Sequence, residues 1–181
     1  METGDGLDLG ADALGEAKAY LRVIGADEDG MLAGLLGAAG AHCEAFTGKV
    51  LLARGFAETA AASGSWRRLA RGPVLAITGI EGVRADGIAV ALPSDAYAID
   101  IDARGDGWFR MSGASGGTRV RVSFQAGLAA NWLGLPEPLR HGVVRLAAHF
   151  YAHRDDAAGG APPAAVTALW RPWRRLGLKL R

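Results

Sequence analysis

The sequence predicts an α+β fold, in which helices from both ends of the chain form one body around a small antiparallel β insertion. Two observations predict this order. Apolar residues recur at helical spacing before Gly48 and again after Pro136, whereas residues 49–127 alternate with the period of strands. With 181 residues, half of them apolar, the chain is long enough to bury a core. We therefore expect one domain that carries an insertion.

The N-terminal part is predicted to hold a loose leader and two helices. Residues 1–11 are rich in Gly and Asp and offer little to pack. A short helix is expected over residues 12–23, with an apolar face of Leu14, Ala17, Leu21 and Ile24. Asp27–Asp29 then supplies a capping side chain and carboxylates that suit the positive end of a second helix, which should end at Gly48.

Residues 49–127 are predicted to form the β insertion. Tyr97, Ile99 and Ile101 alternate with Ala98, Asp100 and Asp102, and a second alternating run covers residues 119–124. Gly and Pro cut the region into short segments. This pattern is typical of short antiparallel strands with one solvent-facing side.

The C-terminal part is predicted to return to helix. A helix should begin at Pro136–Pro138 and run to about Arg154, because Pro is tolerated in a first helical turn. Residues 155–163 read as a flexible break, and a short helix is expected from Ala164 to Trp170. The helical body is thus assigned to residues 12–48 and 128–170, and an extended C-terminal arm to residues 171–181.

Charge and cysteine content exclude several classes of protein. Lys and Arg number 20 against 19 Asp and Glu, so there is no global field that would draw the chain onto nucleic acid or an anionic membrane. Cys43 is the single cysteine, and the acidic N-terminus lacks the pattern of a secretory signal. No apolar run reaches the length of a membrane span. We expect a soluble protein made in the cytoplasm, with no membrane partner.

Motifs that suggest catalysis or metal binding have structural explanations. Residues 113–117 match a G-x-S-x-G pattern around Ser115, but the following residues read as a strand, so a hairpin turn is favoured over a nucleophile elbow. His149 and His153 are spaced for a shared metal, yet with His141 and Arg145 they continue one polar helix stripe. Asp100, Asp102 and Asp106 lack the spacing of a calcium loop. We predict no catalytic residue, metal or cofactor.

The C-terminal arm is the strongest candidate for binding. It carries cations and no acid, interleaved with tryptophan and leucine, and is too short to bury its own apolar side chains. A protein groove, a phosphate backbone or an anionic membrane could receive it, or it could be a solvated tail. Protein docking is favoured, because Trp and Arg are enriched at interfaces. The predicted partner-binding residues are Trp170, Arg171, Pro172, Trp173, Arg174, Arg175, Leu176 and Leu178.

Six segments, taken in order, resemble the phage head-tail connector (adaptor) family, which includes the adaptor proteins of gene transfer agents. The resemblance spans roughly residues 14–176. Two departures are Trp173, where Tyr is common in the family, and an extension over residues 177–181. The segments are Tyr20–Val23, Asp27–Asp29, Glu44–Lys49, Phe124–Gly127, Ala147–Tyr151 and Val166–Arg174.

The resemblance implies a structural subunit of a particle neck, without enzymatic activity, assembled in the host cytoplasm. It implies self-association into a twelvefold ring on the portal protein, with the C-terminal segment reaching into the portal. A further connector or stopper protein is expected on the tail side, and DNA passes through the channel without sequence-specific binding. The alternative is a small nucleic-acid-binding module that uses the basic C-terminal arm, whose affinity should fall steeply with salt.

Overall fold

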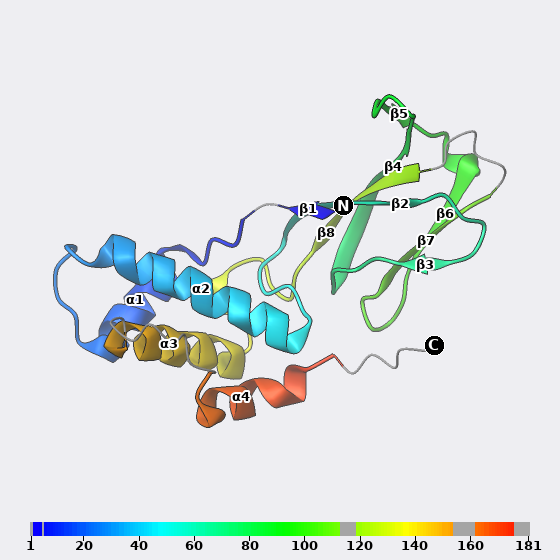
Figure 1. Ribbon diagram of the computed structural model, residues 1–181. Coiled ribbons are helices and arrows are strands. Elements are labelled where there is room, and N and C mark those ends of the chain that lie inside the picture. The colour runs from blue at the N-terminus through cyan, green and yellow to red at the C-terminus, as the bar shows by residue number, and fades with distance from the viewer. Residues whose placement is uncertain (1, 5, 113–118, 154–161, 176–181) are drawn as a thin grey trace. The chain divides into compact units, whose positions relative to one another are not determined.

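The computed structural model describes residues 2–4, 6–112, 119–153 and 162–175, and it confirms the predicted α+β class (Figure 1). The chain divides into two compact units. Residues 1–6 and 53–128 form a β unit, and residues 7–52 and 129–181 form a helical unit. Residues 49–52, which the sequence places in the β insertion, belong to the helical unit, because the Leu51 N–H donates a hydrogen bond of 2.8 Å to the buried Glu44 carboxylate.

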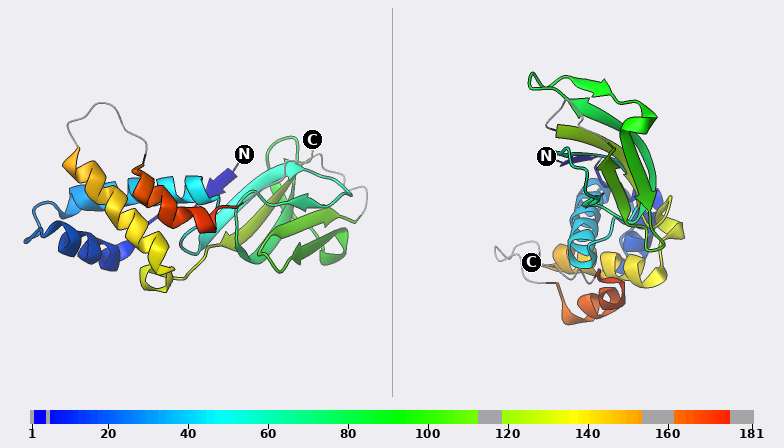
Figure 2. Two further views of the ribbon diagram at one scale, coloured as in Figure 1. Left: turned by 90° about the horizontal axis from the view of Figure 1, so that it is seen from below. Right: turned by 90° about the vertical axis from the view of Figure 1, so that its right-hand side faces the viewer.

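The helical unit packs its helices around one core (Figure 2). Helices α2 and α3 pack on each other, and both contact α1 and α4, so these two helices form the centre of the unit. Leu139, Val143, Leu146 and Ala147 are buried on one face of α3, and Phe150, which continues that face, is partly exposed. The helices and 3-10 turns are α1 (Gly10–Leu21), α2 (Asp29–Thr47), η2 (Trp132–Gly134), α3 (Glu137–Ala152), α4 (Ala164–Trp170) and η3 (Arg171–Trp173).

Two features of the first helices differ from the prediction. Helix α1 ends at Leu21, where Arg22 takes a left-handed conformation with φ of 57°, so Ile24 leaves the helix and is 99% exposed instead of buried. Helix α2 begins at Asp29 without a side-chain cap. The Asp29 carboxylate instead pairs with the Lys18 ammonium at 2.5 Å, which ties α1 to the start of α2. Gly48 ends α2 as predicted, with φ of 69°.

The β unit contains a five-stranded and a three-stranded antiparallel sheet. Their strand orders are β1-β2-β8-β4-β5 and β3-β7-β6. The buried side chains include Phe56, Ile80, Phe109, Val122 and Phe124. The elements are β1 (Glu2–Gly4), β2 (Arg54–Ala61), β3 (Arg67–Arg68), β4 (Val74–Val83), β5 (Ala89–Ala91), η1 (Ser94–Ala96), β6 (Tyr97–Ile101), β7 (Gly107–Met111) and β8 (Arg119–Ala126).

The prediction of a loose leader is wrong for residues 2–4, which form β1 and pair with Phe56–Glu58 of β2. Strand pairing uses backbone groups, so this segment needs no apolar side chains to be ordered. The turn around Ser115 and the break over residues 155–161 lie outside the described residues. Within the described part of the chain, no helix combines the length and apolarity that a membrane crossing requires.

Candidate docking surface of the C-terminal segment

The C-terminal segment, residues 162–175, begins with an anchor inside the helical unit. Helix α4 packs on α3 and α2, and its Val166 and Trp170 are buried, Trp170 with 0% exposure. The space for the indole exists because position 142 of α3 is glycine. A Cβ atom at Gly142 would lie 2.8 Å from Cε2 and 2.9 Å from Cδ1 of Trp170. The pair Gly142 and Trp170 therefore fixes α4 on α3.

This burial corrects the prediction that Trp170 faces a partner. The arm is too short to bury its own apolar side chains within itself, but the slot at Gly142 lies on the chain's own α3. The ring of Phe46 closes this slot at a centroid distance of 6.0 Å from the Trp170 ring. A glycine inside an otherwise apolar helix was the sequence signal for such a close approach. Trp170 contributes stability to the subunit, and the exposed part of the segment begins after it.

The next residues are tied to the C-terminal end of α2. The Arg175 N–H donates a hydrogen bond of 2.7 Å to the Thr47 carbonyl oxygen. The Arg174 guanidinium lies 5.5 Å from the centroid of the Phe46 ring, and the Lys49 ammonium lies 5.7 Å from that of Trp173. Cation–π contacts at such distances contribute about 0.5–1 kcal/mol at exposed sites. Residues 171–175 are thus held against the end of α2.

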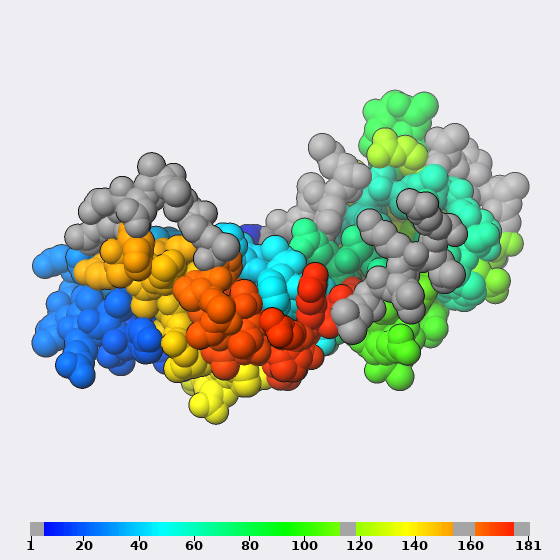
Figure 3. Space-filling model, turned by 60° about the horizontal axis from the view of Figure 1, so that its bottom comes forward, coloured from blue at the N-terminus to red at the C-terminus, as the bar shows by residue number. Residues whose placement is uncertain are grey.

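What this segment exposes is a small cationic and aromatic surface. Arg171, Pro172 and Arg174 are exposed, and Trp173 is half-buried. In the space-filling view, α4 and the residues up to Arg175, coloured orange to red, lie on the outside of the helical unit (Figure 3). Four of the eight predicted partner-binding residues therefore form one surface, which we call the Arg171–Arg174 surface. Leu176 and Leu178 lie outside the described residues.

Comparison with known proteins identifies the setting of this surface. No protein-family profile and no curated protein matches the chain. Solved structures do match. A chain in the neck of an empty gene transfer agent particle, computed with C6 symmetry, is 30% identical with a TM-score of 0.81, and the match covers 100% of this chain and 98% of that one. This chain belongs to the neck proteins of gene transfer agent particles.

Two further structures agree with this assignment. A chain in the neck of a native particle, computed with C12 symmetry, is 30% identical with a TM-score of 0.76, and one in the virion of a native gene transfer agent particle is 28% identical with the same TM-score. Both matches cover 100% of this chain and 98% of the other. The neck protein is thus a structural component of the connection between head and tail.

His149 and His153 of the neck protein lie close together, and the described residues supply no third ligand beside them. The rings of His149 and His153 lie 4.2 Å apart, and Nδ1 of His153 is 2.9 Å from the His149 carbonyl oxygen. Among the residues that the structure describes, no group of three His, Cys, Asp or Glu side chains converges on a point where a metal could bind. His141, on the same stripe, contacts the Tyr20 ring edge to face. The stripe acts as a polar helix face that partly covers α1.

The aspartates near β6 stabilise a turn. The Asp102 carboxylate accepts hydrogen bonds from the N–H groups of Arg104 and Asp106 at 2.8 and 2.9 Å, and from the indole N–H of Trp108 at 3.3 Å. Gly105 provides the left-handed conformation of this turn, with φ of 76°. Three hydrogen-bond donors therefore occupy most of the lone pairs that the Asp102 carboxylate could offer to a cation.

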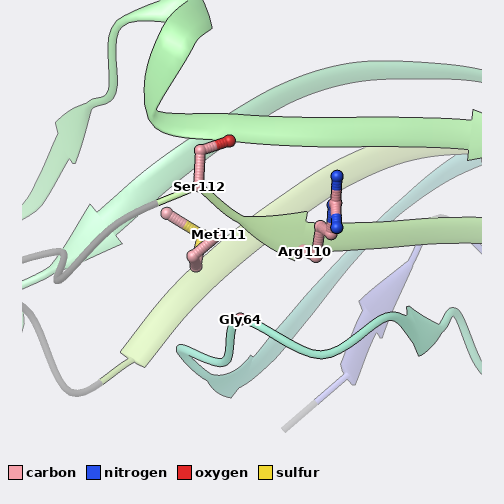
Figure 4. Close-up of a pocket in the computed structure, with 4 residues that line it drawn as sticks. All are labelled: Gly64, Arg110, Met111 and Ser112. Carbon is pink, nitrogen blue, oxygen red and sulfur yellow. The ribbon is translucent and has the colours of Figure 1, made fainter.

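One hollow of about 380 Å³ lies in the β unit of the neck protein (Figure 4). Gly64 comes from the loop after β2, and Arg110, Met111 and Ser112 come from the end of β7. The Arg110 guanidinium lies 4.9 Å from the centroid of Trp66. These lining residues offer one cation and one hydroxyl, which are too few convergent polar groups to define a ligand.

Proposed function

We propose that this neck protein is the adaptor subunit that forms a ring on the portal, around the channel through which DNA passes. The observation that carries the proposal is the whole-chain similarity, at 30% identity, to chains in necks computed with C6 and C12 symmetry. Cyclic symmetry brings two different surfaces of each copy together head to tail. Twelve copies are proposed, in agreement with the C12 neck.

The Arg171–Arg174 surface is proposed as the contact with the portal. Its members belong to the residue types that concentrate binding energy at protein interfaces, and Trp173 offers a flat ring beside the exposed Arg171 and Arg174. A matching portal groove would supply acidic groups for the arginines and an apolar wall for the indole. Leu176 and Leu178 follow this surface. The alternation of leucine with glycine and cations over residues 176–181 favours a different partner for them.

The remaining features of the proposal concern the rest of the neck. A tail-side connector or stopper protein binds another face of the ring. DNA crosses the channel without sequence-specific contacts, and the chain has no catalytic role. The matched structures are components of particles, which supports a structural role.

Charge reversal at the surface tests the portal contact better than truncation. Removing residues 170–181 would also remove the buried Trp170 and destabilise the subunit. The variant Arg171→Glu/Arg174→Glu changes two exposed side chains and gives up one contact within the subunit, that of Arg174 with the Phe46 ring. We expect it to fold normally, as judged by circular dichroism, and to be missing from purified portal-bearing particles, because its carboxylates repel an acidic groove.

The matched control is Arg84→Glu/Arg119→Glu, which reverses two exposed arginines of the β unit and should enter particles at the level of the wild type. Normal incorporation of Arg171→Glu/Arg174→Glu would contradict the portal contact. If the same variant instead lost a salt-dependent affinity of the isolated chain for DNA, the nucleic-acid-binding alternative would be favoured.

A further inference from the structure

Strand β6 is an edge strand of the three-stranded sheet. It pairs with β7 on one side, and the described part of the chain has no strand hydrogen-bonded to its other side. The side chains of Ile99 and Ile101 are 46% and 39% exposed although they lie on the inner face of the sheet, opposite Phe109 and Gly107. The core of the β unit is therefore left open along this edge.

The backbone of β6 is oriented to accept another strand. The Ser112 N–H donates to the Ala96 carbonyl at 2.9 Å, and the Asp102 N–H donates to the Asp106 carbonyl at 3.0 Å. In the register of β6 and β7, hydrogen-bonded and non-hydrogen-bonded pairs alternate. Because Ala96 and Asp102 are hydrogen-bonded to the β7 side, Ala98 and Asp100 between them are too. Tyr97, Ile99 and Ile101 consequently direct their N–H and C=O groups away from β7.

The edge lacks the features that protect open strands. Proteins usually block such an edge with lysine, proline or a bulge. The β6 sequence Tyr-Ala-Ile-Asp-Ile contains neither lysine nor proline, and its pairing with β7 is uninterrupted. The exposed charge on this strand is the carboxylate of Asp100, on the face opposite Ile99 and Ile101. A strand that fits here has apolar residues on the face shared with Ile99 and Ile101, and cations on the face shared with Asp100.

The C-terminus of the same chain has this pattern. Residues 176–181, which lie outside the described residues, read Leu-Gly-Leu-Lys-Leu-Arg, so leucine alternates with glycine and cations at the period of a strand. The three leucines match Ile99 and Ile101, and Lys179 matches Asp100. Lys179 faces Asp100 when Leu180 faces Ile99 in an antiparallel arrangement, or when Leu178 faces Ile99 in a parallel one.

We propose that residues 176–181 of one copy add as a strand to β6 of the neighbouring copy in the ring. The inference rests on the proposed ring, since each copy of a cyclic assembly presents the same tail and the same edge to its neighbours. Main-chain hydrogen bonds would hold such a strand, and alternate side chains would select it. When the ring closes, every tail is bound and every β6 edge is covered.

Disulfide trapping in assembled particles tests the contact. Facing residues of a non-hydrogen-bonded antiparallel pair have Cα atoms about 4.5 Å apart, within the range that a disulfide spans. Particles are assembled from an equal mixture of full chains carrying Asp100→Cys or Lys179→Cys, and are then treated with oxidised glutathione. We expect a disulfide-linked two-chain band on non-reducing gels, and longer ladders when one chain carries both substitutions.

The control replaces Asp100→Cys by Asp95→Cys, an exposed position in η1 outside β6, and should give no band above background. Absence of the two-chain band, or a doubly substituted chain that forms only an internal link, overturns the inference. If the chains are still present in the particles in that case, the proposed function is not contradicted. Wild-type chains that fail to enter particles at all overturn the proposed function and the inference with it.

A second pair of variants addresses the edge itself. Ile99→Lys places a cation on the open edge, whereas Ile88→Lys changes another exposed isoleucine of the β unit. Both chains should remain folded, but Ile99→Lys should lose at least tenfold of the cross-linked yield and Ile88→Lys should retain it. Equal yields from the two variants overturn the assignment of the tail to β6.

Discussion

The groove between α2 and α3 and the open edge of β6 are two apolar surfaces that the chain treats differently. The groove is filled by Trp170 of the same chain, which is fully buried. The β6 edge keeps Ile99 and Ile101 partly exposed and has no partner strand in the described part of the chain. The difference separates residues that hold the subunit together from those available for assembly, and it divides the C-terminal region into an anchor, a surface and a tail.

Truncating the anchor should give the largest effect. Trp170→Ala removes a fully buried indole and leaves a cavity, so we expect the free energy of unfolding to fall by about 3–5 kcal/mol. Trp173→Ala, at a half-buried ring with one cation–π contact, should cost about 1 kcal/mol. Urea unfolding followed by circular dichroism measures both. Equal losses for the two variants would abolish the distinction between anchor and surface.

Filling the slot that holds Trp170 should lower the free energy of unfolding by an intermediate amount. Gly142→Ala places a methyl group within the van der Waals radius of the indole, which should destabilise the subunit by about 1–3 kcal/mol. Gly34→Ala is the matched control, because it adds the same group at an exposed position of α2, with no atom within 4 Å apart from the neighbouring backbone of the helix. Alanine is the better helix former, so this control should stabilise by up to about 1 kcal/mol. The Gly142→Ala cost should largely disappear in a Trp170→Ala background.

Ionisation of the Cys43 thiol at high pH should have the smallest effect on the free energy of unfolding. Burial, and secondarily the charge of Glu44, raise the pKa of Cys43 above its ordinary value of 9.0. The folded state therefore keeps the thiol protonated while the unfolded state ionises, so stability is unaffected below about pH 9 and falls above it. The expected loss is about 1.4 kcal/mol per pH unit.

Cys43→Ala should remove this pH dependence in urea titrations at pH 8, 9 and 10. A cysteine introduced at position 100, on the open edge, should react with iodoacetamide in the folded subunit, whereas Cys43 should react only after unfolding. Rapid alkylation of native Cys43 would show that the helical unit is less closed than its burial indicates.

Most elements could be predicted because their signals are local. Period and punctuation placed α2 up to Gly48, α3 after its proline-rich start, α4 from Ala164 to Trp170, and strands at residues 97–101 and 119–124. The exceptions depend on contacts between distant residues. The strand at residues 2–4 exists only because β2 offers an edge, and Ile24 is exposed because the chain turns at Arg22.

The candidate site was predicted in part for the same reason. Cations and tryptophans marked the C-terminal segment, and Arg171 and Arg174 are exposed as a binding role requires. The burial of Trp170 could not be read from the segment alone, since the slot is made by Gly142 and Phe46, which lie 28 and 124 residues earlier in the chain. The local pattern identified a surface, and tertiary packing decided which tryptophan it contains.

The hydrogen bond from Arg175 to Thr47 sets a length scale for the assembled neck. Beyond this attachment the chain has six residues, whose contour length when fully extended is about 20 Å. If residues 176–181 of one copy pair with β6 of its neighbour, that strand lies within about 20 Å of Thr47. This limit is a geometric test of the proposed contact, independent of sequence or charge.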